Sequence, residues 1–234
     1  MKPNIPVAEA RTPDGSRMVL YKHDRDFVIA VDRQDLMLSR AHESEMELAR
    51  LGCARIAKHR NPAVLIGGLG MGYTLRQTLD LLQPKATVIV AELIPEVVGW
   101  NRDYLGGLTG HPLRDRRVTV QVCDVADLIR RSPGSFDAIL LDIDNGTTAV
   151  TDARNDELYS LEGIRSCMNA LHAKGCLAIW SACVDTQFER RMSREPLHMR
   201  RFRVPAHKGG QARSRCIWVA SEDPRSLPDW EEPD

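Results

Sequence analysis

The sequence lacks a long apolar run and any net charge, and only 5% of its residues are aromatic. Without 18 or more consecutive apolar residues, no transmembrane helix is expected, and the first residues lack the apolar core of a signal peptide. We therefore expect a cytoplasmic protein without a membrane partner. Lysine plus arginine and aspartate plus glutamate both number 32, and this balance argues against binding to nucleic acid.

Metal-binding and disulfide motifs are also missing. The six cysteines form no Cys-x-x-Cys pair, and the seven histidines show neither His-x-His nor His-x-x-x-His spacing. Because structural zinc sites and redox motifs use such spacings, no metal is expected. Most of the cysteines stand in apolar segments, which indicates reduced core thiols.

Apolar residues make up 43% of the sequence, which is enough for a packed core. Its 234 residues suit one large domain with a small appendage. We expect an N-terminal β-hairpin region and linking helix over 1–58, a Rossmann-like nucleoside-binding catalytic domain over 59–222, and a flexible tail over 223–234.

The N-terminal region contains two strand-like runs, 18–21 and 27–31, joined by a short polar segment that suits a hairpin. A partial apolar stripe then predicts a helix over 40–58, with Ser39 as its N-cap.

From residue 62 onward, strands and helices are expected to alternate. This alternation predicts a parallel sheet with helices on both faces. The segments 198–204 and 216–220 lack a full helix between them, which predicts an antiparallel hairpin at the end. The result is a seven-stranded, mostly parallel α/β sheet of the class I methyltransferase type. The five parallel strands are expected at 63–66, 87–91, 118–122, 136–141 and 175–180.

A glycine cluster follows the first of these parallel strands and precedes a helix. Removing side chains here lets a ligand approach the backbone and the free N–H groups of the helix. The dinucleotide fingerprint would place glycine at 73, where the chain has tyrosine, so the spacing favours a nucleoside with a sulfonium tail over NAD. An ordinary tight turn is the alternative. The candidate ligand-binding glycines are Gly67, Gly68, Gly70 and Gly72.

Three acidic residues end three successive strands. Glu92 suits hydrogen bonds from two ribose hydroxyls, and its alternative is a solvated charge. Asp124, beside Val125, suits the adenine amino group, and it can also cap the next helix. Asp142 can take a proton from an amine or hold a cation, or it can organise a loop. Asp144 acts with Asp142 or forms an Asx turn. Together the acids predict a pocket for a cationic nucleoside.

Several segments in about 35–221 resemble the spermidine synthase (polyamine aminopropyltransferase) family, which has the class I methyltransferase fold. These segments are Val64–Gly68, Ala91–Val98, the positions of Asp124 and Asp142, Leu158–Glu162 with Tyr159, and His42-Glu43 as the end of a Tyr-His-Glu motif.

The resemblance implies that an amine attacks the methylene carbon beside the sulfonium of decarboxylated S-adenosylmethionine, as in polyamine biosynthesis. Asp142 would be the catalytic acid, and His42, Glu43, Asp144 and Tyr159 would lie on the acceptor side. A homodimer would also be in keeping with the family.

The sequence departs from the family on the acceptor side of the pocket. An aspartate that contacts the aminopropyl ammonium is replaced by Gly70, and the motif tyrosine is replaced by Ala41. Aminopropyl transfer to a small-molecule amine is the leading hypothesis. A methyltransferase that uses S-adenosylmethionine on a small molecule or protein is the first alternative, and a non-catalytic nucleoside-binding protein is the second. A dehydrogenase is disfavoured by the glycine spacing.

Overall fold

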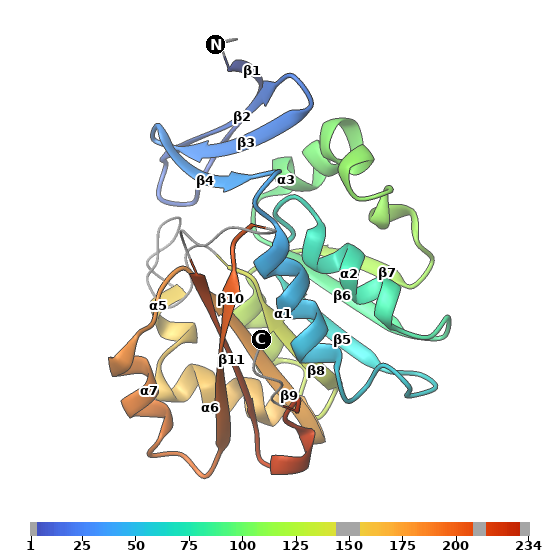
Figure 1. The fold of residues 1–234 in the computed structure, drawn as a ribbon, viewed down its shortest axis with the longest axis vertical. Coiled ribbons are helices and arrows are strands. Elements are labelled where there is room, and N and C mark those ends of the chain that lie inside the picture. Colours follow the sequence, from blue (N-terminus) through green and yellow to red (C-terminus); the bar gives the residue numbers. More distant parts are fainter. Residues whose placement is uncertain (1–3, 144–154, 208–213, 230–234) are drawn as a thin grey trace.

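The computed structural model describes residues 4–143, 155–207 and 214–229. It contains two sheets, a small N-terminal one and a larger one flanked by helices (Figure 1). In the described part of the chain, no helix is long and apolar enough to cross a membrane.

The N-terminal sheet has four antiparallel strands in chain order. Sequence analysis predicted only the middle two, because the outer strands carry few fully buried apolar residues and so lack a clear pattern. One side of this sheet packs against the main domain through Met18, Ile29 and their neighbours. The strands are β1 (Ile5–Arg11), β2 (Arg17–His23), β3 (Asp26–Val31) and β4 (Gln34–Leu38).

Helix α1 spans Glu43–Cys53, and its N-cap residue is His42. The prediction of Ser39 as N-cap is wrong. Its hydroxyl instead accepts a hydrogen bond from the backbone N–H of Phe27 at 2.9 Å, so it links the end of β4 to β3. The helix packs against α2, β8 and β9, so it belongs to the layers of the main sheet.

The main sheet has seven strands in the order β10-β11-β9-β8-β5-β6-β7. Strands β5 to β9 are parallel, and β10 and β11 form an antiparallel pair at one side. This confirms the predicted fold class. The strands are β5 (Ala63–Gly67), β6 (Thr87–Glu92), β7 (Val118–Val122), β8 (Phe136–Leu141), β9 (Leu171–Ser181), β10 (His198–Pro205) and β11 (Ser214–Ser221).

The helices connect the strands and cover both faces of the sheet (Figure 1). They are α2 (Tyr73–Leu81), α3 (Pro95–Trp100), α4 (Val125–Arg130), α5 (Asn155–Leu158), α6 (Leu161–Ala170) and α7 (Thr186–Met192), with a π-turn at Asn101–Leu105 and 3₁₀ turns at Gly106–Leu108, Pro112–Arg114 and Pro224–Ser226.

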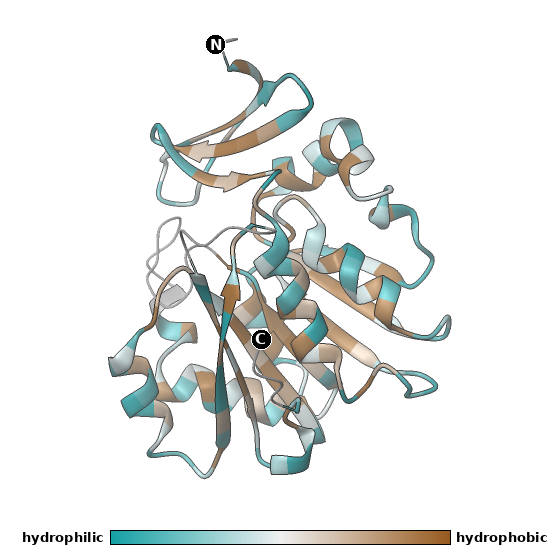
Figure 2. Cartoon of the chain, in the orientation of Figure 1, coloured by the Kyte–Doolittle hydropathy of each residue, from teal (hydrophilic) through white to brown (hydrophobic). Residues whose placement is uncertain are grey.

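Side-chain alternation divides the core into two clusters. Val64 and Ile66 of β5 face one cluster with α1 and α2, whereas Leu65 faces the other with α4 and α6. Figure 2 shows hydrophobic colour concentrated on the central strands. The six cysteines, all within the described residues, are free thiols as expected.

Residues 223–229, part of the predicted flexible tail over 223–234, contact the main domain. Leu227 is 4% exposed and joins the core. Arg55 Nε donates a hydrogen bond to the Leu227 carbonyl, and an Arg200 guanidinium nitrogen donates to the Pro228 carbonyl. A proline-rich composition does not show such contacts in advance, because they join positions far apart in the chain. The remaining residues, 230–234, lie outside the described part.

Candidate functional site

The site lies at the carboxyl ends of the parallel strands. Strand β5 has β6 on one side and β8 on the other, so the chain winds in opposite directions from it. In open α/β sheets a ligand crevice forms at such a reversal. The backbone hydrogen bonds of the main sheet continue just past the strand ends. Gly68 N–H donates to the Ala91 carbonyl, and Asp142 N–H donates to the Gly67 carbonyl, both at 2.8 Å.

The glycine loop, residues 67–72, follows β5 and lies close to the end of β8. Gly68 has φ +89°, and a Cβ there would lie 2.2 Å from the Asp142 carbonyl oxygen, so only glycine fits. Gly70 has φ +50°, and its carbonyl accepts a hydrogen bond from Asn101 Nδ2 at 2.8 Å. Asn101 is 2% exposed. The loop is therefore fixed from both sides. Sequence analysis missed Asn101 because it lies outside any strand end.

Glu92 is 7% exposed at the end of β6. One carboxylate oxygen accepts the Leu69 N–H at 2.8 Å, and the other accepts the Ile94 N–H at 2.9 Å. Burial raises the pKa of Glu92, and these backbone donors oppose the rise. Each oxygen has a further lone pair for a hydroxyl.

Asp124 is the N-cap of α4, and its Oδ1 accepts the Ala126 N–H at 2.8 Å. The capping alternative is thus realised. The same carboxylate also lines the cavity, so capping leaves its second oxygen available for a ligand.

Asp142 follows β8, and its Oδ2 accepts a hydrogen bond from the Thr74 hydroxyl at 2.5 Å. Thr74 lies in the first turn of α2 and is 2% exposed. Burial, with the nearby Glu45 carboxylate as the second cause, raises the pKa of Asp142 to about 7, against the opposing hydrogen bond. A carboxyl with this pKa changes protonation state near neutral pH, as a general base does.

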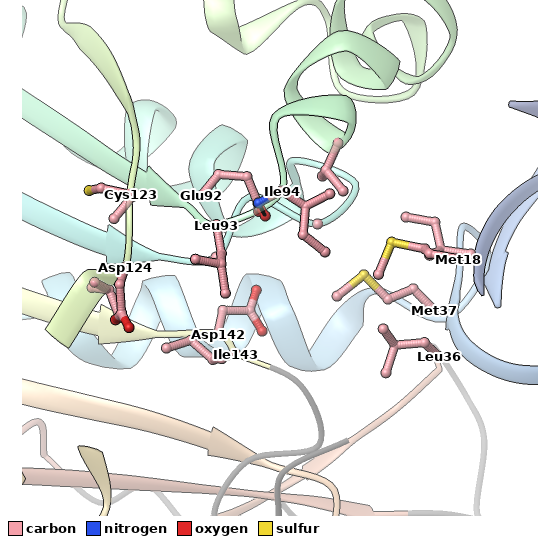
Figure 3. A pocket seen from close by; sticks show the side chains of 16 residues that line it. Met18, Leu36, Met37, Glu92, Leu93, Ile94, Cys123, Asp124, Asp142 and Ile143 are labelled. Carbon is pink, nitrogen blue, oxygen red and sulfur yellow. Dashed lines mark hydrogen bonds between the residues drawn. The ribbon is translucent and has the colours of Figure 1, made fainter. Parts of the chain in front are cut away.

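A cavity with about 690 Å³ of empty space, part of it open solvent, brings these groups together. We call it the large cavity. Figure 3 shows Cys123 and Asp124 toward one end, Glu92 and Asp142 in the middle, and three apolar side chains of the N-terminal region at the other end. Of the predicted site residues, the cavity is lined by Gly68, Gly70, Glu92, Asp124, Val125 and Asp142; its apolar end contains Met18, Leu36 and Met37.

A second cavity, with about 260 Å³ of empty space that includes open solvent, lies against the first, and we call it the small cavity. Asp142 lines both cavities, and Glu45 of α1 lines the small one. Burial raises the pKa of Glu45. Sequence analysis missed this residue. The available signal was its position three, four and seven residues before Leu48, Ala49 and Gly52, which places a carboxylate on the apolar face of the helix.

The remaining predicted residues within the described part of the chain do not line either cavity. Gly67 lies inside β5, and Gly72 is the N-cap residue of α2. The His42 ring stacks on Tyr73 with a centroid distance of 4.1 Å, and Glu43 begins α1. Tyr159 is 2% exposed and packs edge-on against Phe188. Asp144 lies outside the described residues.

Comparison with solved structures shows the same fold in spermidine synthases. The spermidine synthase from Thermotoga maritima matches 96% of this chain and 76% of its own, with a TM-score of 0.71 and 22% identity. A spermidine synthase in complex with the transition-state analogue AdoDATO matches the same shares, with a TM-score of 0.69 and 20% identity. A probable spermidine synthase from Corynebacterium glutamicum matches 93% of this chain and 80% of its own, with a TM-score of 0.66 and 16% identity.

The comparison with curated proteins returns no match. The family model for the spermine/spermidine synthase domain matches residues 46–194, a stretch that runs from α1 to the end of α7 and contains the glycine loop and all three strand-end acids. The chain therefore belongs to the spermine/spermidine synthase family.

Proposed function

We propose that this protein is a transferase that binds a sulfonium nucleoside in the large cavity and transfers its aminopropyl group to a small-molecule amine. The observation that carries the proposal is the position of Asp142 in the walls of both cavities. A group that touches both a donor and an acceptor is what a transfer between two bound substrates requires.

The large cavity suits the nucleoside in its chemistry. Glu92 offers acceptor oxygens for ribose hydroxyls, and Asp124 offers one for the adenine amino group. Three carboxylates near one another also favour a ligand with a positive sulfur. One similar structure, a spermidine synthase, was solved with a transition-state analogue, which is consistent with a reaction centre in this fold.

The small cavity suits the amine. Glu45 and Asp142 place two carboxyl groups in a cavity with the Tyr73 ring and apolar side chains. Alkyl amines have pKa values near that of lysine, about 10.4, so they arrive as ammonium ions. Two acids attract such a cation, and apolar walls suit its alkyl chain.

The reaction begins when the bound ammonium loses a proton to the Asp142 carboxylate. With a pKa of about 7, this group is a stronger base than an ordinary aspartate, whose pKa is about 3.9. The nitrogen lone pair then attacks the methylene carbon, a C–N bond forms, and the C–S bond breaks. Its electron pair goes to sulfur, which leaves a neutral thioether, methylthioadenosine, and a lengthened amine.

A second candidate is methyl transfer from S-adenosylmethionine. The observation that favours it is the apolar end of the large cavity, where Met18, Leu36 and Met37 surround the loop at Gly70. The carboxylate of an intact methionine tail meets no acidic side chain at position 70.

The test combines binding and turnover. Isothermal titration with methylthioadenosine, S-adenosylmethionine and decarboxylated S-adenosylmethionine should show binding of at least one. Mass spectrometry of reactions with diamines should then show methylthioadenosine and an amine lengthened by an aminopropyl group. A methylated product made from S-adenosylmethionine would support the second candidate. Absence of binding for all three nucleosides would exclude both.

A further inference from the structure

The large and small cavities share three lining residues: Met37, Gly70 and Asp142. We call these three the neck. If the two cavities hold donor and acceptor, any group that passes between them crosses the neck. Asp142 has a chemical role in the proposed reaction, whereas the reaction assigns no role to the Met37 side chain.

Met37 lies directly on the glycine loop. An ideal Cβ on Gly70 would come within 2.9 Å of both the Sδ and the Cε of Met37, closer than real Cβ contacts. The end of the methionine side chain therefore occupies the space where a side chain at position 70 would start. The loop contributes bare backbone, and β4 of the N-terminal sheet contributes the side chain that fills the space.

The anchoring of Met37 leaves its side chain room to move. Its backbone pairs with Ile29 across the β3–β4 ladder, which fixes the start of the side chain. Its side chain is only partly buried. Methionine is unbranched with three rotatable bonds, so the thioether end can move between staggered rotamers. Met18, Leu36 and Ile29 give this end of the large cavity an apolar wall.

We propose that Met37 is a specificity-determining residue that closes the neck and opens it only for a narrow, unbranched alkyl chain joined to the nucleoside sulfur. This inference rests on the proposed function, because it takes the large cavity as the nucleoside site. It adds that the N-terminal sheet selects the shape of the transferred chain, in addition to covering the site.

The experiment compares two probes by isothermal titration. Methylthioadenosine carries only a methyl group on its sulfur and does not reach past the neck. Its analogue with a 6-aminohexyl group in place of the methyl reaches through the neck toward Glu45. In Met37→Ala the neck is open, so the aminohexyl chain does not have to displace the Met37 side chain, and we expect this probe to bind about tenfold tighter than to the natural protein. Methylthioadenosine should change less than about threefold.

A second variant tests the mobility of the side chain. Met37→Ile keeps the apolar character and suits a strand, but its branched Cβ makes χ1 stiff. We expect weaker binding of the aminohexyl probe with unchanged binding of methylthioadenosine. Met168→Ala, a partly buried methionine of α6 remote from both cavities, controls for the general effect of removing a methionine.

The outcomes separate the two proposals. Binding of neither probe to the natural protein would overturn this inference, and absence of binding of decarboxylated S-adenosylmethionine and S-adenosylmethionine as well would exclude the proposed function. Binding of both probes with the same affinity ratio in Met37→Ala and the natural protein would overturn the role of Met37 alone. Both probes are measured on the same folded variant. If the substitution lowers both affinities by the same factor, their ratio is unchanged, and this result also counts against the role of Met37.

Discussion

The two cavities differ in how the chain builds them. The polar wall of the large cavity comes from the ends of β5, β6, β7 and β8, which lie side by side in one sheet. The small cavity combines β4, α1, the glycine loop and the end of β8, which belong to different layers. Local sequence patterns therefore encode the first cavity, and tertiary packing creates the second. If the two cavities also differ in function, some variants should lower turnover and others should lower affinity for methylthioadenosine.

Asp142→Asn should give the largest effect. An asparagine keeps the shape but cannot accept the proton of the amine, so turnover should fall about 10²–10⁴-fold, the usual contribution of a general base. Affinity for methylthioadenosine, measured by titration, should change less than about threefold. Asp127→Asn, an exposed aspartate paired with Arg130, is the matched control and should leave both quantities unchanged. An equal loss of binding and turnover in Asp142→Asn would contradict this difference in function.

Glu92→Gln tests the large cavity. Both carboxylate oxygens accept backbone N–H groups, so a glutamine turns one NH₂ group toward a donor and leaves that N–H unsatisfied. The glutamine also replaces a charged acceptor for the ribose hydroxyls, and because hydrogen bonds to charged groups contribute about 1.5–3 kcal/mol, affinity for methylthioadenosine should fall about tenfold to hundredfold. Glu96→Gln changes an exposed glutamate on the following helix and serves as control. Retained affinity in Glu92→Gln would remove Glu92 from the nucleoside site.

The same contrast explains what sequence analysis could and could not predict. The strand-end acids and the glycine loop were found because apolar runs mark parallel strands, whose carboxyl ends meet at one edge. The five parallel strands and the final hairpin followed from the same patterns, and the structure confirms them.

The acceptor side offered no such rule. Glu45 lies on a helix whose apolar stripe is weak, and its approach to Asp142 depends on how α1 packs against α2 and β8. Met37 reaches the glycine loop from the N-terminal sheet, and no local pattern gives the position of one sheet over another. Conversely, His42 and Glu43 were selected by motif similarity, and the structure places them outside both cavities.

The stability of the natural protein relative to Asp142→Asn should depend on pH. The pKa of Asp142 is raised in the folded protein to about 7, so between about pH 4 and 7 the native state binds more protons than the unfolded state, and stability falls as pH rises through this window. The asparagine variant lacks this dependence. Denaturant unfolding should show that the stability of Asp142→Asn relative to the natural protein rises by about 2–3 kcal/mol from pH 5 to pH 8, since each pH unit between 5 and 7 contributes about 1.36 kcal/mol. Parallel curves would show that Asp142 titrates normally.

Thr74→Val should give the smallest effect. The Thr74 hydroxyl donates to the Asp142 carboxylate and so favours its charged form. Its removal should raise the pKa of Asp142 further. Because the base acts when deprotonated, the acid limb of the turnover profile should move to higher pH by several tenths of a unit, with turnover recovered above pH 8.

Two further variants separate this electrostatic effect from packing. Thr74→Ser keeps the hydroxyl and should keep the profile. Thr78→Val removes a buried hydroxyl one turn further along α2 that has no hydrogen-bond partner among the described residues, and it should leave the acid limb in place. If Thr74→Val lowers turnover equally at every pH, the hydroxyl acts through packing, and the connection between α2 and the base is structural only.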